Sequence, residues 1–232
     1  MSELLWLDPL SPIFPDTSKA LSNPDGLLAA GGNLHTDTLH NAYSKGIFPW
    51  FSEGEPILWW APSIRAVLFP EHLSINRGSR KQLRKLGYST SSNQVFGDVI
   101  SACAQQRKET GTWITDDMIS AYQALHSKGI AQSVEIWDGE ELVGGLYGLK
   151  IGSVFCGESM FNRTDNAAKF AFYQTAMHLF GCGYKLIDCQ IPNDFLATLG
   201  VTDISRAEYE DIMSSARTDT LVWPEKWETL EF

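Results

Sequence analysis

Two carboxylates lie in segments that are otherwise apolar and strand-like. Glu158 is the central residue of FCGESMF, and Asp188 is the central residue of LIDCQ. An ionised group is costly in such surroundings unless it is paired or functional. Gln190 follows Asp188 at the i+2 position and therefore on the same face of the strand. We predict that these side chains share a cleft near the C-terminal ends of neighbouring strands. Buried structural acids, satisfied by backbone or hydroxyl donors, are the alternative.

Metal binding and nucleophilic catalysis find little support in the sequence. No HxxxH, HExxH or CxxC spacing and no GxSxG elbow is present, and the histidines lie in separate segments: His35, His40, His72, His126 and His178. Cys189 lies between Asp188 and Gln190, but a cysteine on a buried strand is more often inert packing than a thiolate. We predict no metal, no covalent enzyme intermediate and four reduced cysteines.

One basic segment interrupts an acidic chain. The net charge is -10, yet residues 77–85, RGSRKQLRK, contain no acid and five basic side chains: Arg77, Arg80, Lys81, Arg84 and Lys85. We call this segment the basic island. On a helix its i, i+4 pairs would form a cationic ridge, which suits a phosphate backbone because Lys and Arg contacts supply phosphate affinity. A merely solvated helix face is the alternative.

The composition bounds the class of protein. A chain of 232 residues is one large domain or a compact pair, and an apolar share of 44% excludes a disordered chain. No run approaches the ~20 apolar residues that span a bilayer, and the N-terminus has no basic segment followed by an apolar one. We expect a soluble, cytoplasmic protein with no membrane partner.

The elements that position the candidate residues fall into two regions, which predict domains 1–62 and 63–232. The first region is rich in Pro, Gly and Asn, so we expect short helices and loops there. One better helix starts at Thr36, a possible N-cap, and ends near Gly46. Residues 61–64, APSI, form a plausible boundary.

The second region predicts a mixed α and β domain. We expect helices at 77–86, 93–106, 115–128 and 166–180, and strands at 66–70, 133–137, 141–150, 153–161 and 185–190. Strands, helix, strand in this order is typical of acetyltransferase-like (GNAT-type) cores, so the predicted fold class is α+β with a mixed sheet. The segment CGESMFNRTDNAAK lacks the glycine pair of a coenzyme A loop. We therefore predict an acyl donor other than acetyl-CoA, and no cofactor.

Six stretches follow one another over nearly the whole chain: NPDGLLAAGGNL, YSKGIFPWFSEGEPILWWAP, GTWITDDM, VGGLYG, FCGESMF and LIDCQIPND. Together they resemble the leucyl/phenylalanyl-tRNA–protein transferases, and aromatic-rich strings such as GIFPWF make coincidence implausible. The resemblance implies transfer of Leu or Phe, with Met as a further candidate, from aminoacyl-tRNA to the N-terminal amine of proteins that begin with Arg or Lys, which marks them for degradation. It also implies a small N-terminal domain followed by an acetyltransferase-like domain.

An aminoacyl ester is already activated, so such an enzyme must align an amine with the ester carbonyl and accept a proton. The resemblance implies that Asp188 orients Gln190, which helps to draw a proton from the attacking amine. Alternatively, Asp188 holds the amine itself. Glu158 would recognise the Arg or Lys side chain of the acceptor or share the amine with Asp188, because carboxylates bind such cations with charge-assisted hydrogen bonds.

On the donor side, a terminal adenine needs stacking surfaces and polar neighbours. The residues that the resemblance implies for this role are Trp50, Trp113, Tyr43 and Asn193. Trp59 and Trp60 are expected in the core. The donor side chain would enter an apolar pocket formed by Leu146, Phe155, Phe172 and Ile187. Thr175, one helical turn after Phe172, stands where we expect a larger apolar residue, which leaves the pocket size open.

Two other functions stay open at this point. A catalytically idle acetyltransferase-like module would bind tRNA through the basic island without consuming the ester. A small-molecule or peptidoglycan-type aminoacyltransferase would use the same donor with another acceptor. The favoured partners are aminoacyl-tRNA and acceptor proteins, and we expect the chain to act as a monomer.

Overall fold

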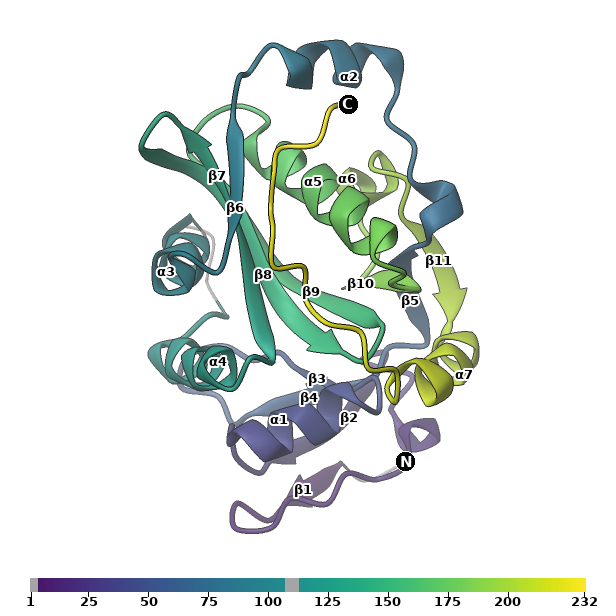
Figure 1. Cartoon of the computed structure of the whole chain (residues 1–232). Coiled ribbons are helices and arrows are strands. Elements are labelled where there is room, and N and C mark those ends of the chain that lie inside the picture. The colour runs from purple at the N-terminus through teal and green to yellow at the C-terminus, as the bar shows by residue number, and fades with distance from the viewer. Residues whose placement is uncertain (1–3, 107–112) are drawn as a thin grey trace.

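The structure is a computed structural model that describes residues 4–106 and 113–232. Its elements form two β-sheets with helices packed around them (Figure 1). Gly111 and Thr112, which open the stretch GTWITDDM, lie outside the described residues.

The first sheet is built from the first 60 residues. Its strands, in spatial order, are β1, Leu5–Leu7, β2, Leu27–Gly31, β4, Leu58–Trp60, and β3, Phe48–Pro49. β1 runs parallel to β2, and the other neighbours are antiparallel. The expectation of only short helices and loops is wrong here. The strands are short, and glycines with positive φ, Gly26 and Gly32, flank β2. The sequence around β2 therefore has the composition of a turn, although the segment forms a strand.

The helix predicted from Thr36 is present as α1, Thr36–Tyr43. Its N-cap is His35 and not Thr36, and no side chain makes a capping hydrogen bond. A short 3-10 turn, η1, covers Thr17–Lys19 before it. α1 buries Leu39 and Tyr43.

The second sheet carries both candidate acids. Its seven strands, in spatial order, are β11, Thr202–Ser205, β5, Ile64–Leu68, β10, Leu186–Gln190, β9, Val154–Asn162, β8, Glu141–Ile151, β7, Ala131–Asp138, and β6, Ser89–Ser92. β9 and β10 are parallel, and the remaining neighbours are antiparallel. Glu158 and Asp188 lie on adjacent strands, as predicted, but Glu158 is at the middle of β9 and not near its C-terminal end.

Helices cover both faces of this sheet (Figure 1). α3, Phe96–Gln106, and α4, Asp116–Ser127, pack on one face, and α5, Ala167–Gly181, packs on the other as the crossover from β9 to β10. The remaining helices are η2, Pro70–His72, α2, Arg77–Arg84, α6, Asp194–Ala197, and α7, Arg206–Ala216. Thr115 caps α4 through a side-chain hydrogen bond to the backbone of Met118, as predicted.

The predicted helices and strands of the second region are confirmed to within a few residues. The largest shift is in the helix predicted from residue 93, which begins at Phe96 because Asn93 adopts a left-handed conformation with φ of 60°. The two sheets separate between residues 60 and 64, close to the predicted boundary. One hydrophobic core nevertheless includes Phe48 and Trp59 together with Val99. The division into domains 1–62 and 63–232 therefore stays a prediction.

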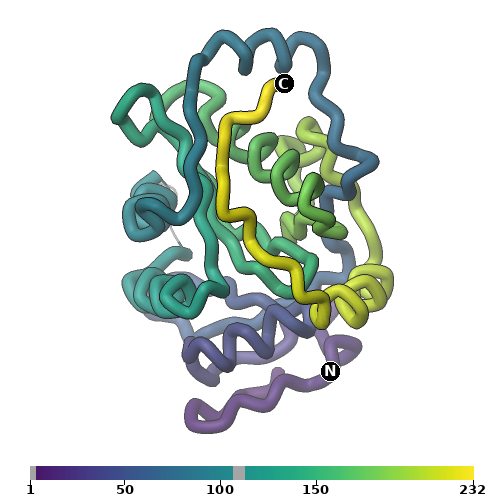
Figure 2. Tube along the Cα trace, in the orientation of Figure 1, coloured from purple at the N-terminus to yellow at the C-terminus, as the bar shows by residue number. Residues whose placement is uncertain are grey.

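The segment after α7 crosses the molecule beside α5 and ends near α2 (Figure 2). Gln174 of α5 makes two hydrogen bonds to the backbone of Leu230, and Arg84 of α2 donates to the carbonyl of Phe232. The tail thereby ties α2 to the core.

Candidate active site

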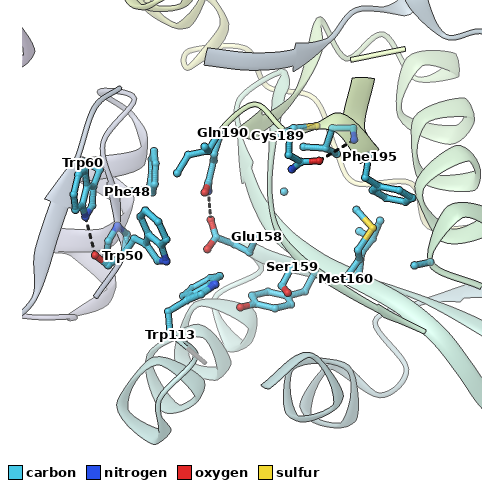
Figure 3. A pocket seen from close by; sticks show the side chains of 18 of the residues that line it. Phe48, Trp50, Trp60, Trp113, Glu158, Ser159, Met160, Cys189, Gln190 and Phe195 are labelled. Atoms are coloured by element: carbon cyan, nitrogen blue, oxygen red, sulfur yellow. Dashed lines mark hydrogen bonds between the residues drawn. The ribbon is translucent and has the colours of Figure 1, made fainter. Parts of the chain in front are cut away.

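A cavity of about 1440 Å³ lies where the first sheet meets β8, β9, β10 and α5. Its walls come from distant parts of the chain: Trp50 and Trp60 from the first sheet, Glu158 from β9 and Gln190 from β10 (Figure 3). The cavity is thus a product of the way the two sheets pack together.

Glu158 occupies a bulge in β9. Ser159 pairs with Tyr147 and Gly157 pairs with Gly148, so Glu158 has no partner opposite it on β8. One carboxylate oxygen accepts hydrogen bonds from the Tyr43 hydroxyl at 2.6 Å and from the Gln190 carboxamide at 2.6 Å, and the other accepts from Tyr122 at 3.0 Å. The bulge therefore presents the acid at the cavity wall with three donors around it.

Burial raises the pKa of Glu158 to about 7, although the hydrogen bonds from Tyr43, Tyr122 and Gln190 act in the opposite direction. Burial, followed by the charge of Glu158, also raises the pKa of both tyrosines well above the usual value. Both phenols stay protonated and remain donors. A carboxyl group with this pKa can hold or release a proton near neutral pH.

This pKa predicts a pH-dependent stability. The folded chain keeps a proton on Glu158 that the unfolded chain has released between about pH 4.5 and pH 7, so the free energy of unfolding should fall as pH rises through that window. The loss is on the order of 3 kcal/mol. Chemical denaturation of the wild type and of Glu158→Gln, repeated at about one-unit steps between pH 4 and 8, measures the contribution of Glu158 to the free energy of unfolding. A difference between the two proteins that does not change with pH would contradict the assignment.

Asp188 lies beneath the cavity and has no exposed surface. Oδ1 accepts from Arg65 Nε and from the backbone N–H of Gln190, both at 2.8 Å. Oδ2 accepts from Arg65 Nη2 at 2.6 Å and from the Tyr209 hydroxyl at 2.8 Å. Asp188 is not among the residues that line the cavity. This geometry does not support the expectation that Asp188 itself holds the acceptor amine.

Gln190 and Cys189 close the site on the β10 side. Gln190 has a left-handed backbone, with φ of 65°, and its side chain points to Glu158 (Figure 3). Cys189 lines the cavity, but burial, followed by the charge of Asp188, raises the pKa of its thiol well above the usual range. The thiol stays protonated, which fits the interpretation of Cys189 as packing.

Trp50 and Trp113 both line the cavity, and the side chain of Trp50 is 43% exposed. Trp60, expected in the core, also lines the cavity, and its indole N–H donates to the Trp50 carbonyl at 2.7 Å. Trp59 is fully buried, in agreement with the expectation. Trp50 and Trp113 therefore offer two flat aromatic surfaces to the cavity, on which a nucleic-acid base could stack.

The other two residues predicted on the donor side occupy different places. Asn193 lines the cavity, while its side chain caps α6 by accepting from the backbone N–H of Leu196 at 2.9 Å. Tyr43 is fully buried behind Glu158 and does not line the cavity. Tyr43 therefore supports the acid, and this geometry does not favour contact with a nucleoside.

The apolar residues predicted for the donor side chain line one part of the cavity together: Leu146, Phe155, Phe172 and Ile187. They come from β8, β9, α5 and β10. Thr175 also lines the cavity, as does Met160, for which the sequence carries no signal. The spacing of Thr175 from Phe172 on α5 correctly indicates a shared face.

Several residues of the site carry no recognisable signal in the sequence. Tyr122, Arg65 and Tyr209 reach the two acids only through tertiary contacts. Ser159 lines the cavity with a buried hydroxyl that has no hydrogen-bond partner in the described part of the chain. A polar group of a bound substrate could supply that partner.

The basic island forms α2, with Asn76 as its N-cap. Its five basic side chains are exposed, and none belongs to an ion pair among residues 4–106 and 113–232. Leu83 anchors the helix in the core. Arg84 also donates to the carbonyl of Phe232, so the other four basic side chains are the ones free to face a ligand.

No group of three or more His, Cys, Asp or Glu side chains that could hold a metal ion occurs in the described residues. No helix in that same part of the chain is long and apolar enough to cross a membrane.

The chain was compared with known families and structures. The family model for leucyl/phenylalanyl-tRNA protein transferase matches residues 67–214, and the model for the N-terminal domain of that family matches 32–63. A solved structure of FemX has a TM-score of 0.46 with 12% identity over 77% of this chain and 71% of its own, a similarity too low to bear on fold or function.

Curated relatives cover almost the whole chain. A leucyl/phenylalanyl-tRNA–protein transferase of Pseudomonas fluorescens (strain Pf0-1) is 52% identical over 212 residues, which are 91% of this chain and 94% of that protein. The protein of the same name from Cellvibrio japonicus (strain Ueda107) is 46% identical over 227 residues, or 97% of both chains. On this evidence the chain belongs to the leucyl/phenylalanyl-tRNA protein transferase family of enzymes.

Proposed function

We propose that this chain transfers Leu or Phe from aminoacyl-tRNA to the N-terminal amine of proteins that begin with Arg or Lys. The observation that carries the proposal is the Glu158–Gln190 pair, which lies in one cavity with two accessible tryptophans and an apolar pocket. These features match the parts of one substrate: a terminal adenosine, an ester and an apolar side chain. Membership of the family supports the same donor.

The reaction needs no covalent enzyme intermediate. The acceptor nitrogen forms a bond to the ester carbonyl carbon, the bond from that carbon to the ribose oxygen breaks, and the proton lost by the amine ends on the ribose hydroxyl. Alignment of the two substrates contributes most, since it can supply about 7 to 11 kcal/mol of the barrier. Glu158, with a pKa of about 7, holds the amine and takes its proton, while Gln190 orients both.

The remaining assignments complete the proposal. Trp50 and Trp113 stack on the terminal adenine, with Asn193 beside them. The second sheet, with α5 between its two parallel strands, is an acetyltransferase-like fold without a coenzyme A loop. The enzyme acts as a monomer in the cytoplasm, and its products are marked for degradation. The idle RNA-binding module is not favoured, because the relatives are named as transferases.

One assay tests the function directly. Charged leucyl-tRNA is incubated with a peptide that has N-terminal Arg, and the peptide is weighed by mass spectrometry. A gain of one leucine residue is expected, and none on the same peptide with N-terminal Glu or an acetylated amine. Transfer to a free amino acid or a cell-wall peptide instead would show that the acceptor is of another class.

Reversing four charges of the basic island, Arg80, Lys81, Arg84 and Lys85, to Glu should weaken tRNA binding. Each lost phosphate contact removes about 0.7 to 0.9 from the slope of log affinity against log salt, so the slope should flatten. The effect should be equal for charged and uncharged tRNA, because α2 does not line the cavity. An unchanged slope would show that the basic island is a solvated helix face that does not contact tRNA.

The donor should be selected by the apolar pocket and not by the tRNA body. Ile and Val carry a methyl group on Cβ, and a single methyl difference is worth about 1 to 3 kcal/mol, so Ile should be rejected about 10 to 200-fold relative to Leu. Since Thr175 lines the cavity, Thr175→Phe should penalise Phe transfer more than Leu transfer. Competition between Leu, Phe, Met, Ile and Val on one tRNA measures both effects. Equal use of Ile and Leu would contradict the first claim, and an unaltered Phe-to-Leu ratio the second.

A further inference from the structure

The guanidinium of Arg65 makes three hydrogen bonds next to the cavity, although Arg65 is not among the residues that line it. Its side chain is 2% exposed and its ion pair with Asp188 is fully enclosed. Nη1 donates to the carbonyl of Gly46 at 3.0 Å, while Nε and Nη2 each donate to one oxygen of Asp188. The fork geometry of arginine makes this a two-point attachment that fixes the plane of the carboxylate.

Two aromatic rings pack against the guanidinium. Its central carbon lies 4.8 Å from the ring centroid of Phe48 and 4.5 Å from that of Tyr209. A Cβ at Gly46 would come within 2.9 Å of the Tyr209 ring, so the glycine there lets the ring pack closely. The guanidinium is thus fixed by the first sheet, by α7 and by its own ion pair.

Asp188, held in place by Arg65, in turn fixes the backbone of Gln190 through a hydrogen bond. With Arg65, Tyr209 and the Gln190 N–H bound, each carboxylate oxygen accepts two hydrogen bonds, and none of its usual acceptor capacity is left for a substrate. The bond to the Gln190 N–H holds that residue at φ of 65°, a conformation that a residue with a side chain rarely adopts. From this backbone the Gln190 side chain reaches Glu158 at 2.6 Å.

We propose that Arg65 is a positioning residue, which acts through Asp188 to hold Gln190 in its left-handed conformation and so to place the Gln190 carboxamide against Glu158. Asp188 in this arrangement anchors the backbone of Gln190 and does not contact the substrate. A buried ion pair contributes little net stability compared with apolar residues of the same volume, so its value here is geometric. The inference rests on the proposed function only for the rate measurements below.

A double-mutant cycle separates positioning from general structural support. Arg65→Lys keeps the positive charge and loses the fork, and a misplacement of about 1 Å can cost about 100-fold, so we expect transfer in single turnover to slow about 10 to 100-fold. In the Gln190→Ala background, Arg65→Lys should slow transfer by less than about a third of the factor seen in the wild-type background. The reason is that the group that Arg65 positions is already absent. The same factor in both backgrounds, or no loss in the wild-type background, would overturn the proposal.

A second measurement does not depend on transfer activity. The carboxamide protons of Gln190, assigned in the NMR spectrum by their loss in Gln190→Ala, should exchange with solvent faster in Arg65→Lys than in the wild type. Unchanged exchange would overturn the positioning role. If wild-type protein transfers no leucine while the exchange rates differ as expected, the proposed function fails and the positioning inference stands.

Arg206 provides a matched control. It is partly buried and donates to the backbone carbonyls of Thr17 and Ala61, so it also joins the first sheet region to α7, but it does not contact the acids. Arg206→Lys should leave transfer and the Gln190 exchange unchanged. If Arg65→Lys does not fold, Tyr209→Phe takes its place in the cycle, because it removes one bond to Asp188 and keeps the ring over Arg65.

Discussion

Replacing Glu158 by glutamine should slow transfer by a factor of about 10² to 10⁴, the usual cost of losing a positioned acid or base. Glutamine keeps the size of the side chain and loses the charge and the ability to take a proton. The hydroxyls of Tyr43 and Tyr122 and the carboxamide of Gln190 would then meet a group that accepts at one atom only. Single-turnover transfer from leucyl-tRNA to a peptide with N-terminal Arg measures the effect. Affinity for tRNA should be unchanged, because α2 lies outside the cavity.

Glu135 is a matched control for this substitution. It lies on β7, is fully buried and accepts hydrogen bonds from the hydroxyls of Ser91 at 2.6 Å and Ser133 at 2.5 Å. It does not line the cavity. Glu135→Gln should transfer leucine at the wild-type rate at a temperature where the protein is folded. Wild-type turnover in Glu158→Gln, or an equal loss in both variants, would remove Glu158 from the reaction.

The second large effect concerns stability. Asp188→Ala leaves the guanidinium of Arg65 buried without its counter-ion, and breaking a buried pair in this way costs about 3 to 5 kcal/mol. For a chain of this size each 1 kcal/mol lowers the melting temperature by about 2 to 4 °C, so a fall of roughly 6 to 20 °C is expected in a thermal scan. Transfer should be lost as well, since Gln190 loses its backbone partner.

An exposed ion pair gives the contrast. Lys185 and Asp219 lie 2.9 Å apart with side chains 44% and 37% exposed, and exposed pairs of this kind contribute little to stability. Asp219→Ala should therefore change the melting temperature far less than Asp188→Ala. Adding Arg65→Met to Asp188→Ala removes the unpaired charge and should restore part of the stability without restoring transfer. A small effect of Asp188→Ala on stability would show that the pair is not buried in solution.

Local sequence patterns suffice where the signal is local. The helix of the basic island, the capped α4 and the hairpin strands β7, β8 and β9 have periodicity, caps and turns that depend only on neighbouring residues. The first sheet escapes this kind of reasoning. Its strands are too short for a period, and what makes them strands is pairing between separate segments of the chain, such as Leu5 with Ala29 and Leu27 with Trp60.

The sequence by itself determined the two acids of the site and the family to which the chain belongs. An acid in an apolar strand is unusual enough to mark Glu158 and Asp188, and the long aromatic motifs mark the family. The tertiary structure alone decided what each residue contacts. The bulge at Glu158, the left-handed turn at Gln190 and the cavity between the first sheet and β9 put one acid on the cavity wall and leave the other buried behind it. The physical reason is that burial and hydrogen-bond partners depend on segments far apart in the chain. The ion pair of Asp188 with Arg65, 123 residues away, therefore has no trace in the local pattern around either residue.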